Sequence, residues 1–301
     1  MIDTATSGQA VAELLRGYSI EVNPSQTTVV DAAPDRLDPG TEVFLPWIPG
    51  ANPMGTVAAA GELRRAGLVP VPHIGARHIE SAAQLGQLAA SFAGAGVDRV
   101  LIIGGDRAKP AGPYDSSLQV MQTEAFQKLG IVRIAIAGFP EGNPNISATA
   151  LDGALTEKAD FARSTGLQLS VITQFCFEAD PIVAWLHHIR ARGIDLPVRV
   201  GLAGPAGLVT LARYAVRCGI GNSLHVLTQN PAFARLLVEK GPEPIIRRIA
   251  AFDGIGSDKA EDRQSRSLGI AGLHFYVFGG FDKTVDWISA QRGQQTPSTH
   301  P

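Results

Sequence analysis

The sequence predicts an α/β fold, a (β/α)8 TIM barrel formed by a single domain over residues 1–292. Three observations predict it. Short runs of apolar and β-branched residues recur eight times, and alanine- and leucine-rich stretches with helical spacing separate them. Glycine follows many of these stretches, as it does at helix C-termini. No G-x-G-x-x-G follows the first run, which disfavours the runner-up fold, a doubly wound dinucleotide-binding sheet.

Strands are expected where apolar or β-branched residues cluster between turn signals. In chain order they are Tyr18–Asn23, Glu42–Ile48, Val69–Ile74, Arg99–Gly104, Arg133–Gly138, Leu169–Phe177, Val198–Leu202 and Leu273–Phe278. Stretches such as SAAQLGQLAASFAGAG and DPIVAWLHHIRARG lie between them and are expected to form helices. The segment Asn222–Ser267 is long enough for extra helices between strands seven and eight. The polar residues 293–301 are expected to form a disordered tail.

Composition narrows the classes of function. Hydrophobic residues make up 45% of the chain, enough for a full core, and the formal net charge of −2 gives no electrostatic case for nucleic acid or an anionic membrane. Neither a membrane span nor a signal-peptide pattern occurs, so a cytoplasmic location is expected. Cys176 and Cys218 are expected to be buried free thiols. No set of metal ligands emerges at the predicted strand ends.

Functional side chains of such a barrel collect where its strands end. Glu21 ends the first strand and is a candidate acid with a raised pKa; a salt-bridged structural glutamate is the alternative. Gly104, Gly105 and Asp106 end the fourth strand. The paired glycines either form a bare turn or leave room for a flat ring, with Asp106 facing it.

Other polar residues at strand ends allow two interpretations each. Gln174 lies among apolar residues, and its amide either bonds to the backbone or reads the edge of a polar heterocycle. His73 is followed by Arg77 and His78, and either is structural or helps to bind an anionic group. The helical pair His187–His188 is expected to face solvent. This inventory suits a flat heteroaromatic ligand and redox or proton-transfer chemistry carried by a cofactor.

Several motifs occur in the order seen in methylenetetrahydrofolate reductases. They are SIEVNP, GGD, GFPEGNP, ITQFCFEAD and LHFYVF, and the resemblance spans roughly residues 15–290. The chain thus resembles a family that folds as a (β/α)8 barrel and holds FAD across the strand ends. In that family, NADH or NADPH passes hydride to the flavin, and the flavin then reduces 5,10-methylenetetrahydrofolate to 5-methyltetrahydrofolate.

The resemblance also implies a role for individual residues. Glu21 matches the general acid that opens the five-membered ring of the substrate, and Asp106 matches an aspartate near flavin and pterin. Gln174 matches a glutamine that bonds to the substrate, and Leu208 is also placed with the folate. The residues assigned to the flavin are His73, Gly105, Asp106, Phe139, Asn143, Asp152 and Lys158.

The chain departs from the family pattern mainly around the flavin. Gly104 stands where relatives have arginine, Phe139 replaces a tyrosine, Asn143 replaces a histidine, and Pro46 supplies no hydroxyl. At roughly 0.5–1.5 kcal/mol for each neutral hydrogen bond, these losses weaken FAD binding. A flavin-free enzyme that transfers hydride directly from NAD(P)H is therefore one alternative.

A non-redox folate-binding barrel, such as a methyltransferase partner, is a second alternative. The ITQF motif disfavours another kind of flavin-dependent barrel reductase. Folate is the expected small-molecule partner, and neither nucleic acid nor a membrane is expected. The sequence is compatible with a homo-oligomer.

Overall fold

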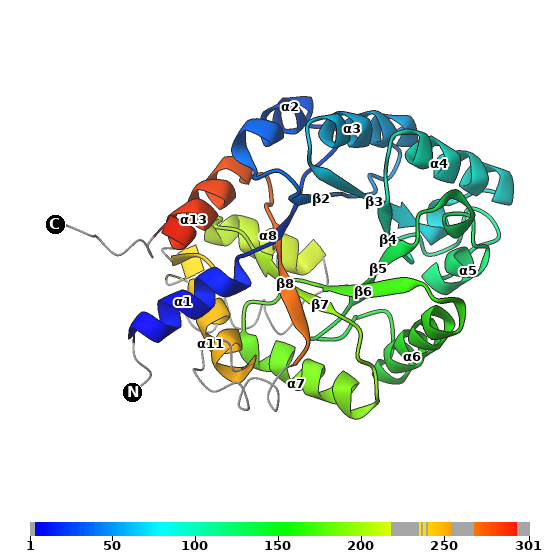
Figure 1. Cartoon of the computed structure of the whole chain (residues 1–301). Coiled ribbons are helices and arrows are strands. Elements are labelled where there is room, and N and C mark those ends of the chain that lie inside the picture. The colour runs from blue at the N-terminus through cyan, green and yellow to red at the C-terminus, as the bar shows by residue number, and fades with distance from the viewer. Residues whose placement is uncertain (1–3, 218–234, 236, 239, 254–267, 294–301) are drawn as a thin grey trace. The chain divides into compact units, whose positions relative to one another are not determined.

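A computed structural model describes residues 4–217, 235, 237–238, 240–253 and 268–293. Eight strands pair in chain order as a closed barrel, and the adjacent pairs from β1 to β5 and the pair β7–β8 are parallel. The predicted fold class is confirmed. The strands are β1 (Ser19–Glu21), β2 (Glu42–Leu45), β3 (Val69–Gly75), β4 (Arg99–Ile103), β5 (Arg133–Gly138), β6 (Gln168–Thr173), β7 (Val198–Ala203) and β8 (Ile270–Tyr276) (Figure 1).

Helices alternate with these strands. They are α1 (Thr4–Leu14), α2 (Thr27–Arg36), α3 (Pro53–Arg65), α4 (Ala82–Gly94), α5 (Ser117–Gln122), α6 (Ala148–Thr165), α7 (Ala179–Ala191), α8 (Leu208–Arg217), α11 (Glu243–Asp253) and α13 (Phe281–Gly293). Short 3-10 turns, η1 (Ala76–His78) and η2 (Gln127–Leu129), follow β3 and α5. Helix α11 lies in the predicted extra segment between strands seven and eight, much of which is outside the described residues.

The chain divides into two compact units. The Glu21 unit comprises residues 19–138 and 149–172, and the Gln174 unit comprises residues 1–18, 139–148 and 173–301. The domain bounds 1–292 stay a prediction. Gly293 ends α13, and the rest of the predicted polar tail lies outside the described residues.

The core of the Glu21 unit is formed by the strands. One apolar residue from each of β2 to β6 contributes to a single buried cluster: Phe44, Val71, Leu101, Ala135 and Ile172. Helices α2, α3 and α4 lie along the outer side of β2, β3 and β4 (Figure 1). Register partners on parallel strands point to the same side, and Glu21 pairs with Phe44. The last residue of β1 is therefore in line with the apolar interior.

Seven of the eight strands begin or end at different residues than predicted, and the two largest shifts, in β6 and β8, have identifiable reasons. Strand β6 stops at Thr173, because the Tyr276 hydroxyl donates to the Thr173 carbonyl (3.0 Å) and the Gly201 N–H donates to the Thr173 hydroxyl (2.8 Å). Side chains thus replace the backbone ladder at this point. Strand β8 begins at Ile270, three residues earlier than predicted. The pairing with β7 shifts by one residue there, since Val198 pairs with Ile270 and Arg199 with Gly272. The glycines of this irregular start make it resemble a loop in the sequence.

A polar network joins the N-terminal ends of four strands of the Glu21 unit, three of which begin with a charged residue. Arg99, which begins β4, bonds to Glu42 at the start of β2 and to Asp98 (2.9 Å). Asp98 also accepts from Arg133 at the start of β5 (2.8 Å), and Arg133 donates to Gln168 at the start of β6 (3.3 Å). The Arg99 and Glu42 side chains are only 22% and 15% exposed, so this pair is largely shielded from water, whereas 49% of the Arg133 side chain is exposed.

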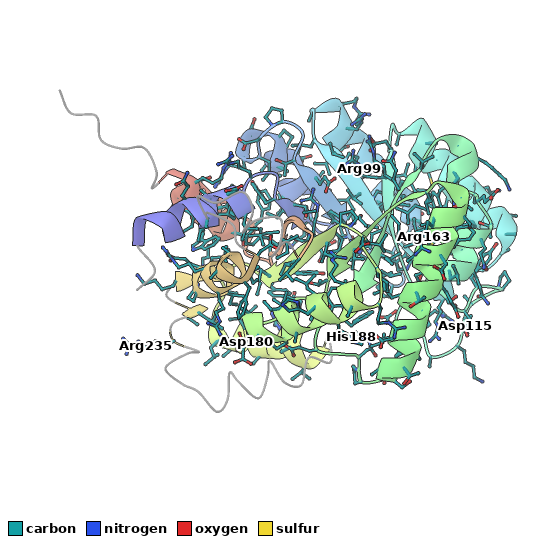
Figure 2. The ribbon with its side chains drawn as sticks, turned by 60° about the horizontal axis from the view of Figure 1, so that its bottom comes forward. Arg99, Asp115, Arg163, Asp180, His188 and Arg235 are labelled. Atoms are coloured by element: carbon teal, nitrogen blue, oxygen red, sulfur yellow. The ribbon has the colours of Figure 1, made fainter. Side chains whose placement is uncertain are left out.

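Replacing Arg99 by methionine is expected to lower the free energy of unfolding by about 2–3 kcal/mol, because Glu42 and Asp98 lose a shielded guanidinium. Urea unfolding measures the change. The matched control is Arg163→Met on α6, whose partner Asp160 lies 3.0 Å away at an exposed position. We expect that variant to lose no more than about 0.5 kcal/mol, and equal losses in both variants would contradict a special role for the network. Both arginines are labelled in Figure 2.

Candidate functional site

Glu21 and His73 come together inside the Glu21 unit. The distance from Glu21 Oε2 to His73 Nε2 is 3.9 Å, and 23% of the Glu21 side chain is exposed. Burial raises the pKa of Glu21 from 4.5 to about 7, because a desolvated carboxyl group favours its neutral form. The salt-bridged structural glutamate is thus disfavoured: a carboxyl group paired with a cation would have a lowered pKa.

His73 is a buried, neutral and polar neighbour of this acid. Burial lowers its pKa from 6.5 to about 3, so the imidazole carries no charge at neutral pH. Its ring packs edge-on against Phe44, with centroids 5.9 Å apart. Nε2 is buried and has no hydrogen-bond partner among the described residues. Such an atom is rare in a folded protein, and a bound molecule or a water would satisfy it.

Asp106 also has a histidine partner, and it is His78, not His73. His78 Nε2 lies 2.6 Å from Asp106 Oδ1. The two side chains differ in burial: 9% of the histidine and 72% of the aspartate is exposed. His78 lies at the end of η1, and Trp47 packs beside its ring at a centroid distance of 5.7 Å. Sequence reasoning named His78 only as a neighbour of His73 and did not single out Trp47.

Of the two glycines that follow β4, Gly105 makes room for the ring of His78. A Cβ atom at Gly105 or at Gly75 would lie 3.0 Å from His78 Cδ2. Gly105 also has a φ of +93°, which side-chain-bearing residues rarely adopt. Gly104, by contrast, has nothing within 4 Å of a Cβ placed on it. The sequence signal for this arrangement is that Gly75 and Gly105 each lie just after a predicted strand, with His78 three residues after Gly75.

Two predicted flavin residues lie on α6 of the same unit. Asp152 and Lys158 are both half-buried, and they are separated by six residues. At 3.6 residues per turn, they face directions about 120° apart. Burial lowers the pKa of Lys158, against the opposing effect of Glu157.

The Gln174 unit holds the remaining predicted site residues. Gln174 directly follows β6 and is half-buried, and its carbonyl oxygen lies 3.8 Å from the Cys176 sulfur. Leu208 begins α8 and is 43% exposed. Phe139 is half-buried, and the Asn143 side chain accepts from the N–H of Asn145 (2.9 Å), which stabilises its own turn.

Aromatic side chains surround the end of β8 in this unit. Phe278 has a φ of +49°, a left-handed conformation that costs free energy in a residue with a bulky side chain. Its ring stacks on Tyr214 at 4.1 Å and packs against Phe175 at 4.9 Å. These contacts hold the strained residue in place. Most aromatics of the LHFYVF motif therefore belong to the packing of this unit.

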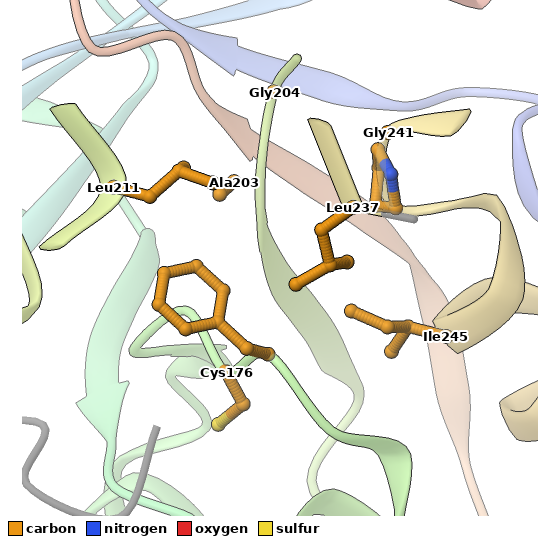
Figure 3. Close-up of a pocket in the computed structure, with 9 residues that line it drawn as sticks. Cys176, Ala203, Gly204, Leu211, Leu237, Gly241 and Ile245 are labelled. Atoms are coloured by element: carbon orange, nitrogen blue, oxygen red, sulfur yellow. The ribbon is translucent and has the colours of Figure 1, made fainter. Parts of the chain in front are cut away.

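A small apolar pocket of the Gln174 unit contains Cys176. Leu211, Leu237 and Ile245 point into it, beside Ala203 and Gly204 (Figure 3). The thiol is buried, as predicted, and burial raises its pKa well above the usual value, with Glu141 adding to the effect. A thiol held protonated is a poor nucleophile and a poor metal ligand. Cys218 lies outside the described residues.

Among the described residues, no three His, Cys, Asp or Glu residues gather in a way that could hold a metal ion. No helix in the described part of the chain is long and apolar enough to cross a membrane. His187 and His188 are exposed on α7, as predicted, and Figure 2 labels His188.

No protein-family model matches this chain. Among solved structures, it is similar to phosphoenolpyruvate phosphomutase from Streptomyces platensis subsp. rosaceus, with a TM-score of 0.45 and 12% identity over 93% of this chain and 85% of that one. It is also similar to D-psicose 3-epimerase, with a TM-score of 0.41 and 13% identity over 78% of this chain and 97% of that one. Both of those proteins are enzymes, and similarity at this level concerns the fold alone.

Glu21→Gln is expected to stabilise the protein at high pH. The unfolded chain ionises Glu21 near 4.5 and the folded chain only near 7, so the wild type loses stability as pH rises between these values. The neutral amide avoids this loss, which amounts to roughly 3 kcal/mol above the higher value. Urea unfolding at about pH 4 and about pH 8 measures it. A stability difference that does not change with pH would contradict the burial of this carboxyl group, and exposed Glu157→Gln is the control.

Gly105→Ala is expected to destabilise the protein by about 1–3 kcal/mol, because the new methyl group meets His78 and the backbone is left-handed. Gly104→Ala, one residue earlier, should change the free energy of unfolding by no more than about 0.5 kcal/mol. Thermal or urea unfolding compares the two variants. Equal effects at both positions would refute the packing of His78 against Gly105.

Proposed function

We propose that this protein is an enzyme that reduces 5,10-methylenetetrahydrofolate to 5-methyltetrahydrofolate, with NADH or NADPH as hydride donor and Glu21 as general acid. The observation that carries the proposal is the Glu21 carboxyl group, desolvated to a pKa of about 7 beside a neutral histidine. A general acid works best when its pKa lies near the working pH. The ordered motifs that resemble methylenetetrahydrofolate reductases supply the substrate class.

The acid has a definite task in this reaction. Protonated Glu21 gives its proton to the anilinic nitrogen of the five-membered ring while the bond from that nitrogen to the methylene carbon breaks. The product of this step is an iminium cation, balanced by the Glu21 carboxylate. Hydride from the dihydronicotinamide then reduces the methylene carbon to a methyl group, and oxidised nicotinamide leaves. Solvent restores the proton on Glu21.

His73 supports the same chemistry without taking the proton. With a pKa of about 3, it stays neutral while Glu21 titrates, and its buried Nε2 is free to bond to the ligand or to a water between ligand and acid. A cationic histidine at 3.9 Å would lower the pKa of Glu21, and less of the Glu21 carboxyl group would then carry a proton at neutral pH.

Part of the residue set assigned to FAD is engaged within the Glu21 unit itself. The space over Gly105 holds the His78 ring, Asp106 bonds to that ring, and Asp152 and Lys158 face different directions on α6. No arginine precedes Gly105 to bind the cofactor. We therefore favour direct transfer of hydride from NAD(P)H to the folate, and binding of FAD stays a prediction that the visible spectrum of the purified protein tests.

Glu21→Gln is expected to lower kcat by about 100- to 10,000-fold, because the amide cannot supply the proton. In the wild type, kcat should fall as pH rises through about 7, since only protonated Glu21 is active. Methylenetetrahydrofolate-dependent oxidation of NADH and NADPH measures both effects. Glu157→Gln, exposed on α6, is the control and should keep wild-type activity.

Three outcomes separate the proposal from its alternatives. Turnover by colourless protein supports direct transfer, whereas turnover that requires bound flavin restores the flavin route. Folate binding without any turnover favours the non-redox folate-binding barrel. If Glu21→Gln retains full activity, Glu21 is not the acid.

A further inference from the structure

We infer that His78 is a positioning residue that holds the Asp106 carboxylate ready for the pterin ring of the folate. The inference rests on the proposed function and adds to it a residue outside the family motifs. Its basis is a hydrogen bond between a buried ring and an exposed carboxylate, with Nε2 and Oδ1 separated by 2.6 Å.

His78 and Asp106 differ in burial, and this difference determines which of the two side chains is held in place. An exposed carboxylate normally moves among rotamers, and exposed ion pairs contribute little to stability. Here one partner cannot move, because only 9% of the His78 side chain is exposed. The donor is fixed in place and the acceptor faces solvent. A short hydrogen bond of this kind orients Asp106 toward whatever approaches from outside.

The surroundings of His78 fix the ring. Its Cδ2 atom lies against Gly75 and Gly105, and a Cβ on either glycine would lie 3.0 Å from it, a tight contact. Trp47 covers the ring at a centroid distance of 5.7 Å. A Cβ at either glycine would push against the imidazole. Gly75 and Gly105 thus leave room for the ring that orients Asp106.

Arg77 ties the two backbone segments of the pair together. Its N–H donates to the Gly104 carbonyl (2.9 Å), and its own carbonyl accepts from the Ala111 N–H (2.9 Å). Its guanidinium binds Asp115, with Nη2 and Oδ1 2.9 Å apart. Arg77 thus pairs with a different aspartate and does not neutralise Asp106, whose side chain is 72% exposed.

The chemistry of the pair selects its ligand. When His78 donates from Nε2, the carboxylate keeps its second oxygen and the remaining lone pairs as acceptors. A pterin presents a ring N–H and an amino group side by side, which match the two oxygens of one carboxylate. A phosphate or carboxylate group would be repelled by Asp106. The pair is suited to a neutral, donor-rich heterocycle and unsuited to the phosphates of a dinucleotide.

The test is a double-mutant cycle on the whole protein, with steady-state kinetics for both substrates. His78→Ala is expected to raise KM for methylenetetrahydrofolate about tenfold, the effect of one misplaced charge-assisted hydrogen bond, while kcat and KM for the nicotinamide change less than about twofold. In an Asp106→Ala background, adding His78→Ala should change KM for folate by no more than about twofold, because its effect passes through Asp106. His188→Ala, exposed on α7, is the control.

His78→Gln distinguishes orientation from packing. Its amide can still donate to Asp106, so KM for folate should return toward the wild-type value. If the alanine variant does not fold, His78→Phe, which keeps a ring but has no donor, takes its place and should raise KM for folate in the same way. Fully additive effects in the cycle, or equal increases in KM for both substrates, would overturn the inference while leaving the reductase intact. If the wild-type protein has no turnover, the proposed reductase activity is refuted. Calorimetric titration with 5-methyltetrahydrofolate then tests the role of His78 through the Kd of the wild type and of His78→Ala. If the wild type does not bind this folate, both the proposed function and the role of His78 are overturned.

Discussion

The parallel register of β1, β2 and β3 is the constraint on which the candidate site depends. It pairs Glu21 with Phe44 and Phe44 with Val71, so the last residue of β1 is level with the apolar cluster formed by the neighbouring strands. His73, two residues after Val71, lies on the same side of β3. Desolvation of both polar groups follows from this placement alone. A shift by one residue would turn Glu21 away from the interior and restore an ordinary carboxyl group.

This burial has opposite consequences for stability and for chemistry. Ionising Glu21 costs more in the folded protein than in the unfolded chain, and the neutral His73 offers no charge to offset this cost. The same desolvation keeps a large share of Glu21 protonated near pH 7, which is the state that the proposed general acid requires. At the opposite ends of the strands, the network around Arg99 and Asp98 pairs charge with charge. Its residues begin strands, a position that serves stability in barrels of this class.

The two histidines of the Glu21 unit illustrate how different contacts give one residue type different roles. His73 packs against Phe44, and its Nε2 has no hydrogen-bond partner within the described part of the chain. His78 is equally buried, yet its polar atom is used by Asp106. In the Gln174 unit, hydrogen bonds also decide where a polar side chain lies. Thr173 bonds to Gly201 and Tyr276, and β6 ends there, just before Gln174.

The alternation of apolar runs and helical stretches determined the barrel and its eight strands, because these features depend on local periodicity. The same pattern placed Glu21, Asp106 and Gln174 at or just after strand ends. The exposure of His187 and His188 likewise follows from one helix face. Only the tertiary structure decided which group each of these residues meets. The pKa of Glu21, the pairing of His78 with Asp106 and the ring that fills the space over Gly105 all depend on residues distant in sequence. No local pattern records such contacts, since desolvation and hydrogen bonding are set by neighbours in space.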